Sequence, residues 1–137
     1  MIKGSCLCGG VRYEADGPLR RFARCHCVQC RKASGAEFAT NASVSRGGFR
    51  LLQGEDLLRQ FEWSPGQARV FCGRCGSPIM RLARNMPDDI RLRMGCLDSD
   101  LDEGPVVHAF VSEKPTWSEI HDDLPQFATV PERIPGT

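Results

Sequence analysis

Residues 72–76 read CGRCG, in which Cys72 and Cys75 lie at i and i+3 on a tight turn. The small glycines let such a turn close around two sulfur atoms. Cys6 and Cys8 lie at i and i+2, and in an extended segment side chains with this spacing point to the same side. The two pairs together supply the four thiolates of a closed tetrahedral metal site. We expect this site to be structural, because four protein ligands leave no open coordination position. It would join the first segment of the chain to its middle.

A second cysteine cluster has a different composition. The segment CHCVQC brings Cys25, Cys27 and Cys30 together within six residues. Three protein ligands leave the fourth position of a tetrahedral zinc open for water or substrate. A site rich in thiolates is suited to binding another sulfur, and such binding favours the nucleophilic thiolate. The alternative is that His26 or Cys96 closes this site, which would then be purely structural.

Seven of the eight cysteines of the chain fall into these clusters. In a reducing cytoplasm they are expected to be thiols and not disulfides. Isolated cysteines often serve as small buried hydrophobes, but three clusters with these spacings favour metal binding. An iron–sulfur cluster is an alternative, and the division into separate groups of four and three fits zinc better. The spacing therefore predicts two zinc ions per chain.

The length and composition are typical of a small globular protein. The chain has 137 residues, of which 41% are hydrophobic and 26% charged, enough for one domain with a core and too few for two. Short segments that alternate apolar and polar side chains predict β-strands over residues 11–15, 57–63, 67–72 and 90–96, and a nearly continuous apolar run predicts a buried strand over residues 106–111. The best helix candidate spans residues 28–34, with Gly35 placed to end it. We expect one mainly β domain over residues 1–137, with few short helices and an irregular tail beyond about residue 128.

The charge balance and the apolar pattern limit the partners. Lys and Arg number 18 against 17 Asp and Glu, a net charge of +1, whereas a nucleic-acid-binding face normally needs a stronger basic bias. No apolar run approaches the roughly 20 residues needed to cross a bilayer, and the N-terminus shows no signal-peptide pattern. We expect a cytoplasmic protein without nucleic-acid or membrane partners, and the sequence leaves its oligomeric state open.

The cysteine motifs resemble those of a known family. Residues 4–11 (GSCLCGGV), 25–36 (CHCVQCRKASGA) and 71–77 (FCGRCGS) follow the pattern of the glutathione-dependent formaldehyde-activating enzyme family, which also includes centromere protein V. The resemblance continues through residues 95–98, His108, Trp117 and residues 124–127, so it covers nearly the whole chain. The ordered combination of these motifs is highly specific.

The resemblance implies both a fold and an activity. It implies a β-rich, zinc-binding fold of the Mss4-like type, with a structural zinc on four cysteines and a second zinc on three. The ligand sets it implies are Cys6, Cys8, Cys72 and Cys75, and Cys25, Cys27 and Cys30. The implied reaction joins formaldehyde to glutathione to give S-hydroxymethylglutathione and is classed as a carbon–sulfur lyase reaction. A zinc site on a given fold can serve different substrates, so another thiol or aldehyde is an alternative.

Charged residues near the second cluster are candidates for substrate contacts. Arg31 and Lys32 directly follow the third thiolate and could meet the carboxylates of glutathione, or simply form an exposed basic pair on a helix. Glu37 could act as a base, but the family usually has a small or apolar residue there, which favours a solvated carboxylate. Six other arginines are scattered and are expected on a solvated surface: Arg12, Arg20, Arg21, Arg24, Arg46 and Arg50.

Three residues outside the clusters can be interpreted as structural or as functional. His108 stands in an apolar run, where a satisfied core histidine is the commoner case, and proton shuttling stays open. Trp117 could line a pocket, although aromatic residues in a small β domain usually pack in the core. Cys96 is expected as a buried thiol on the inward face of a strand.

Two functions of different classes follow. The first is a zinc-dependent carbon–sulfur lyase that acts on a thiol–aldehyde adduct, with Cys25, Cys27 and Cys30 as the ligands of its open catalytic site. The second is a non-catalytic, zinc-stabilised binding module whose metal sites only hold the fold.

Overall fold

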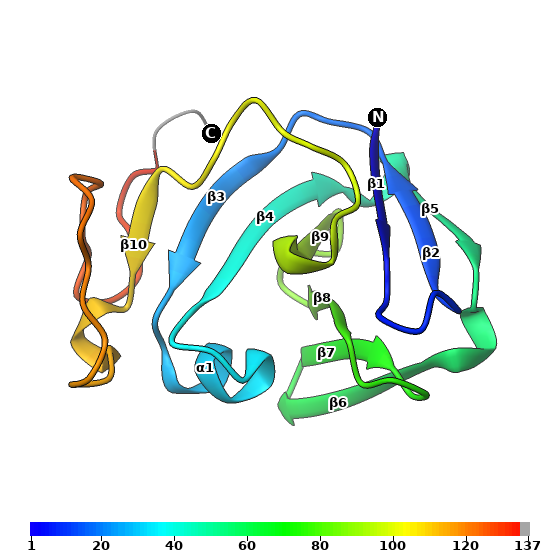
Figure 1. The fold of residues 1–137 in the computed structure, drawn as a ribbon, viewed down its shortest axis with the longest axis horizontal. Helices are drawn as coiled ribbons and strands as arrows, with labels where there is room; N and C mark the ends of the chain where they lie inside the picture. The colour runs from blue at the N-terminus through cyan, green and yellow to red at the C-terminus, as the bar shows by residue number, and fades with distance from the viewer. Residues whose placement is uncertain (135–137) are drawn as a thin grey trace.

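Two β-sheets, one of three strands and one of seven, dominate the computed structural model, which describes residues 1–134 (Figure 1). The small sheet has the order β1-β2-β5, and the large sheet the order β10-β3-β4-β9-β8-β7-β6. Neighbouring strands are antiparallel apart from β10, which pairs with β3 in parallel. The mainly β class predicted from the sequence is confirmed.

The strands are short, and the one α-helix among the described residues lies between β3 and β4. The strands are β1 (Ile2–Ser5), β2 (Arg12–Ala15), β3 (Arg20–Cys25), β4 (Ala39–Ser45), β5 (Phe49–Gln53), β6 (Leu58–Ser64), β7 (Gln67–Cys72), β8 (Pro78–Ala83), β9 (Asp89–Arg93) and β10 (Val107–Ala109). The helix is α1 (Val28–Ser34), and 3-10 turns occupy Arg46–Gly48, Glu55–Leu57, Met94–Cys96 and Val111–Glu113. No helix within residues 1–134 is long and apolar enough to cross a membrane.

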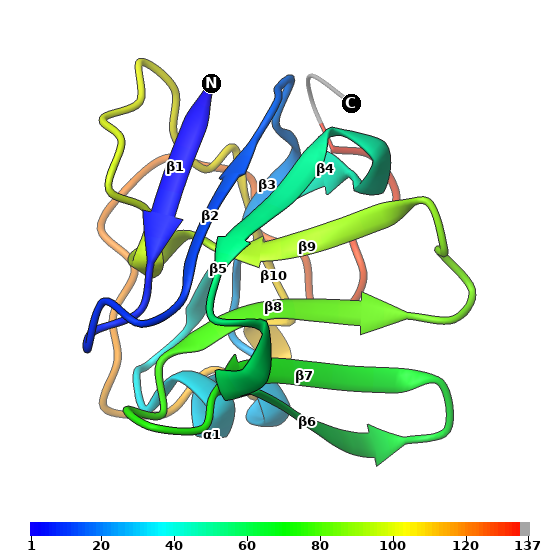
Figure 2. The same ribbon diagram turned by 90° about the vertical axis from the view of Figure 1, so that its right-hand side faces the viewer.

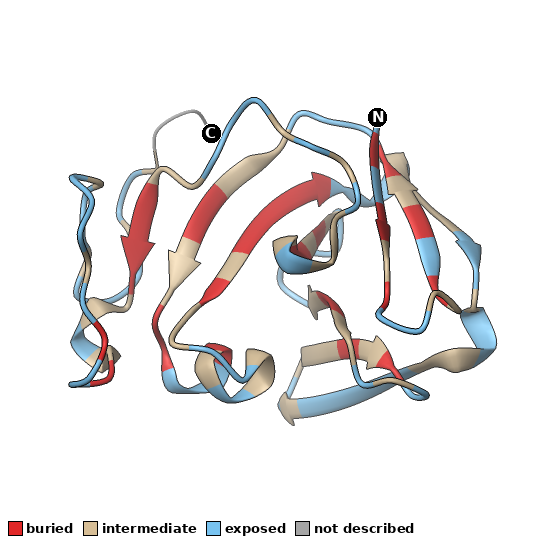
Figure 3. Ribbon diagram, viewed as in Figure 1, coloured by how far each residue is buried: buried red, intermediate tan, exposed pale blue. Residues whose placement is uncertain are grey.

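The large sheet has one apolar face and one polar face. In β9, Ile90 and Leu92 are buried in the main core, whereas Arg91 points to the opposite side because successive strand residues alternate. The small sheet covers the apolar face and adds Tyr13 and Ala15 of β2 to the same core (Figures 2 and 3). Burying side chains of this size stabilises the fold by about 1.5–3 kcal/mol each. The opposite face of the large sheet is therefore left for polar side chains.

Several predicted elements agree with the structure in their bounds. The helix spans Val28–Ser34, and Gly35 ends it with a φ of 63°, the left-handed conformation that a glycine adopts without strain. The predicted strand over residues 67–72 is β7, and it follows β6 across the turn at Pro65 and Gly66. Residues 128–134 contain no helix or strand, as expected for the tail, and the rest of that tail, residues 135–137, lies outside the described residues.

Four expectations were wrong in detail. The strand predicted over 90–96 ends at Arg93, because Leu97 pairs with Gly4 of the small sheet and draws the chain away from the large one. Cys96 therefore lies half-buried in a 3-10 turn, where its thiol donates to the carbonyl of Pro78 at 3.1 Å. The strand predicted over 106–111 is limited to Val107–Ala109, since Phe110 adopts a φ of 56°. Trp117 is 70% exposed and is not part of the core.

Candidate metal centre and adjoining cavity

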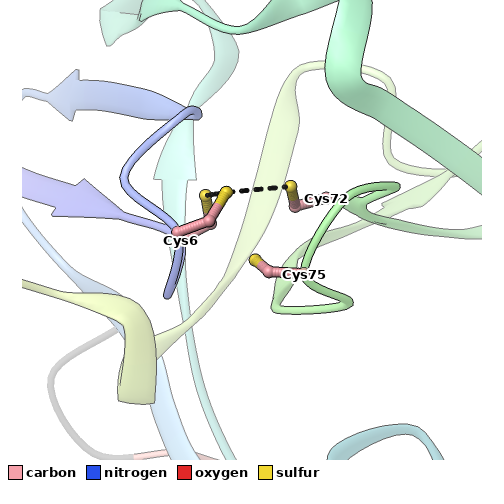
Figure 4. A group of neighbouring side chains, drawn as sticks. Cys6, Cys72 and Cys75 are labelled. Carbon is pink, nitrogen blue, oxygen red and sulfur yellow. Dashed lines mark hydrogen bonds between the residues drawn. The ribbon is translucent and has the colours of Figure 1, made fainter.

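The turn after β1 and the turn after β7 bring four cysteines together. The Sγ atoms of Cys6, Cys8, Cys72 and Cys75 all lie within 4.8 Å of one another. The Sγ of Cys8 lies 3.4 Å from that of Cys6 and 3.8 Å from that of Cys72. The sulfurs of Cys6, Cys72 and Cys75 point into one small space between the two sheets (Figure 4). This group can hold a metal ion with four thiolates.

Neighbouring hydrogen-bond donors favour the charged form of two of these sulfurs, those of Cys8 and Cys75. The guanidinium of Arg74 donates from Nε to the Sγ of Cys8 at 3.2 Å. The pKa of Cys8 is lowered, first by the backbone N–H of Gly10 and then by Arg74. Hydrogen bonds from Ser77 lower the pKa of Cys75 to about 5. Thiolate, and not thiol, is the form that binds metal, so this environment suits a metal site.

The second cysteine group lies where β3 ends and α1 begins. The Sγ atoms of Cys25, Cys27 and Cys30 lie within 4.8 Å of one another, and the group contains no other ligand-type side chain among residues 1–134. Cys27 is also the N-cap of α1, since its Sγ accepts the backbone N–H of Cys30 at 3.3 Å. Helix geometry thus fixes two of the three sulfurs. The group can hold a metal ion with three thiolates.

The electrostatics of this group concentrate negative charge on one sulfur. Hydrogen bonds from the thiols of Cys25 and Cys27, followed by the charge of Arg93, hold the pKa of Cys30 far below its ordinary value. The buried Arg93 lies with its Nη1 3.9 Å from the Sγ of Cys30 and donates to the Oδ1 of Asn41 at 2.6 Å. A thiolate is therefore stabilised in this group at neutral pH.

A cavity of about 450 Å³ opens beside the three cysteines. All three line it, whereas none of the four cysteines of the first group does. Trp63 of β6 and Phe110 after β10 form apolar parts of its wall. Residues from the C-terminal segment, including Val130 and Pro131, add a further side. The volume is within the usual range for small-molecule sites, so a ligand can reach these sulfurs.

A row of arginines forms the floor of this cavity. Arg69 of β7 is the cross-strand partner of Arg81 in β8, and Arg81 is in turn the partner of Arg91 in β9. All three line the cavity, together with Arg21 of β3. Burial, followed by the charges of Arg21 and Arg81, lowers the pKa of Arg91 to about 10. The guanidinium groups are thus close enough to repel one another.

Two buried histidines form a chain of hydrogen bonds behind the second cysteine group. Nε2 of His26 and Nδ1 of His108 lie 2.8 Å apart, and Nε2 of His108 lies 2.9 Å from the carboxylate of Asp122. Arg24 pairs with the same carboxylate at 3.0 Å. Because the carboxylate accepts from His108, the network assigns a donating Nε2–H to His26. Burial, and then His108, lower the pKa of His26 to about 4, so this residue is neutral at pH 7.

The residues predicted to contact substrate do not line the cavity, whereas residues that were not predicted to do so line it. Arg31 and Lys32 lie on α1 and are not among the residues that line the cavity, so their role as substrate contacts stays a prediction. Of the six arginines expected on a solvated surface, Arg12 and Arg46 are exposed. Arg20, Arg24 and Arg50 are half-buried in ion pairs, and the expectation is wrong for Arg21, which lines the cavity. The sequence indicated only that Arg91 lies on the polar face of a strand, and it did not predict that this residue lines a cavity.

Comparison with known proteins assigns the family. A family model described as glutathione-dependent formaldehyde-activating enzyme matches residues 1–113. The chain belongs to this family. The match includes both cysteine groups and the arginines of β7, β8 and β9, and it confirms the resemblance inferred from the cysteine motifs.

The fold is similar to that of a solved protein structure. A crystal structure of a Rhodobacter sphaeroides protein, a structural genomics target, has 24% sequence identity and a TM-score of 0.62. The alignment covers 75% of this chain and 97% of that one. At this identity the similarity concerns the fold alone. No curated protein matches the chain.

Proposed function

We propose that this family member is a zinc-dependent carbon–sulfur lyase that interconverts a thiol of the glutathione type, formaldehyde and their S-hydroxymethyl adduct. The observation that supports it most is the position of Cys25, Cys27 and Cys30, which meet at one end of a cavity large enough for a small molecule. None of the four cysteines of the other group lines this cavity, and that group is suited to a structural role.

The residues present fit two zinc ions. Both groups consist of free cysteines with their sulfurs within 4.8 Å of one another, and soft thiolate donors suit zinc. Cys6, Cys8, Cys72 and Cys75 would complete a tetrahedral set, whereas Cys25, Cys27 and Cys30 would leave one position open. Zinc bound in the second group would accept the sulfur of a substrate thiol and favour its thiolate form.

Residues in and near the cavity would shield the bound thiol from water and stabilise negative charge beside it. The cavity wall at Trp63 and Phe110 excludes water from one side of the bound thiol. Arg93 and Asn41 hold negative charge at Cys30, so the cysteine group keeps its charged form next to the substrate. The substrate sulfur then forms the new C–S bond as the C=O π bond of formaldehyde opens. The proton that the thiol gave up ends on the hydroxymethyl oxygen, so the reaction involves no redox step.

The first test is metal stoichiometry. Protein purified without added metal should contain close to two zinc ions per chain by elemental analysis, because each cysteine group would hold one. Alanine at both Cys25 and Cys30 should lower the content to about one while the four-cysteine group keeps its ion. A zinc content well below one in the unaltered protein, with disulfides found by mass spectrometry, would exclude the metal assignment.

The second test is catalysis above the uncatalysed reaction. Two-dimensional exchange NMR should show faster exchange between formaldehyde hydrate and its glutathione adduct with protein than with buffer at equal thiol. Cys27→Ser should reduce the rate to the buffer value, because it removes one thiol from the open group, whereas Cys96→Ser, outside both groups, should leave it unchanged. Equal rates for protein, Cys27→Ser and buffer, together with no glutathione binding by calorimetry, would favour a zinc-stabilised binding module instead.

A further inference from the structure

The arginines that line the cavity form a row of like charges across neighbouring strands, which is an unfavourable arrangement in a sheet. Arg69, Arg81 and Arg91 are directly opposite one another on three adjacent strands and point to the same face. Like charges in such cross-strand positions destabilise a sheet. Arg21 of β3 adds a fourth positive charge to the same cavity.

Most contacts of these arginines are made to neutral groups, and Arg69 also interacts with the sulfur of Cys30. Arg81 donates to the Oε1 of Gln67 at 2.7 Å, and Arg91 donates to the Oγ of Ser43 at 3.1 Å. Arg69 stacks over the ring of Trp63 at 4.4 Å, and its buried Nη1 has no hydrogen-bond partner.

Acidic residues do not neutralise this row within the described part of the chain. Among residues 1–134, none of Arg21, Arg69, Arg81 and Arg91 forms an ion pair with a carboxylate. Asp89 lines a small neighbouring cavity, but its carboxylate already pairs with Arg20 at 2.7 Å. Partly buried cations that lack a counter-charge make the cavity strongly attractive to anions.

The second cysteine group does not supply enough negative charge to balance the row. Three thiolates around one zinc ion carry a formal charge of −1, against the four arginines of the cavity. A ligand that carries carboxylates would balance the remaining positive charge. Arginine is well suited to this task, because its planar fork binds carboxylates in a bidentate manner.

We propose that Arg21, Arg69, Arg81 and Arg91 form an anion subsite that binds the carboxylates of the substrate thiol while its sulfur lies at Cys25, Cys27 and Cys30. This inference rests on the proposed function and adds a selection rule: the cavity takes acidic thiols and discriminates against neutral ones. It also places substrate recognition on the large sheet and not on Arg31 and Lys32 of α1.

Calorimetry with the zinc-loaded protein at one fixed ionic strength tests the rule. Glutathione should bind at least ten times more tightly than its diethyl ester, in which both carboxylates are masked. Arg81→Gln and Arg91→Gln should each weaken glutathione binding about tenfold and change ester binding much less. Arg84→Gln, an exposed residue just beyond β8 that does not line the cavity, removes the same charge and should leave both affinities unchanged.

The outcomes separate this subsite from the proposed function. Equal affinities for the two thiols in the unaltered protein, with exchange catalysis intact, would overturn the subsite alone. Arginine variants that weaken both thiols equally would also overturn it, because that result indicates a structural effect. Failure of both glutathione and its diethyl ester to bind, with exchange at the buffer rate, would overturn the function and the subsite together.

Discussion

Replacing Cys72 with serine is expected to abolish stable folding at 25 °C, or to lower the free energy of unfolding by about 4 kcal/mol or more. Cys72 is fully buried in the main core and belongs to the four-cysteine group that joins the turn after β1 to the turn after β7. Metal-binding energy at such a site is folding energy, because the unfolded chain does not hold the four sulfurs together.

Two other Cys→Ser variants provide the comparison. Cys27→Ser should cost less, because its group is local in sequence and because serine is itself a good N-cap for α1. Cys96→Ser makes the same chemical change outside both groups, at a thiol that donates to the carbonyl of Pro78, and should cost no more than about 1 kcal/mol. Urea denaturation of the three variants measures the order. A smaller loss for Cys72→Ser than for Cys27→Ser would mean that the structural and open sites are assigned the wrong way round.

Gly54→Ala is expected to destabilise the protein by about 2–4 kcal/mol. Gly54 has a φ of 90°, and a Cβ there would lie 2.4 Å from the carbonyl oxygen of Gly10 and 2.8 Å from the Cα of Val11. Backbone atoms cannot rotate away as a side chain can. The segment that would have to move follows Cys8 directly, so the variant should also weaken zinc retention by the four-cysteine group.

A second glycine serves as the matched control for this prediction. A Cβ at Gly104 would meet no atom within 4 Å, so Gly104→Ala should be neutral or slightly stabilising. Urea denaturation and zinc release to a chelator measure both variants side by side. Equal stability of Gly54→Ala and Gly104→Ala would show that the contact between residue 54 and the loop at Gly10 does not constrain the fold.

The cysteine groups could be predicted from the sequence because their chemistry is local. Spacing within each cluster indicated which sulfurs can meet, and the structure brings Cys6 and Cys8 to Cys72 and Cys75 as expected. The helix over 28–34 was predictable for the same reason, since Gly35 marks its end within the segment itself. Period-two patterns also showed that Ile90 and Leu92 share a buried face.

The arginine row could not be predicted, because it depends on strand register. Arg69, Arg81 and Arg91 each lie in a different strand, and only the pairing of β7 with β8 and of β8 with β9 aligns them. The exposed Trp117 shows a related limit, since an aromatic residue in a segment without helix or strand gives no periodic sign of its burial. Long-range pairing, and not local preference, decides such positions.

The parallel strand β10 has a consequence for the wall of the cavity. It carries the chain back beside β3 and the three cysteines, after which the C-terminal segment runs past the cavity and contributes Val130 and Pro131 to its wall. The family match ends at residue 113, before that wall begins. Substitutions in residues 130–134 would therefore change the shape of the cavity wall while all seven clustered cysteines stay in place.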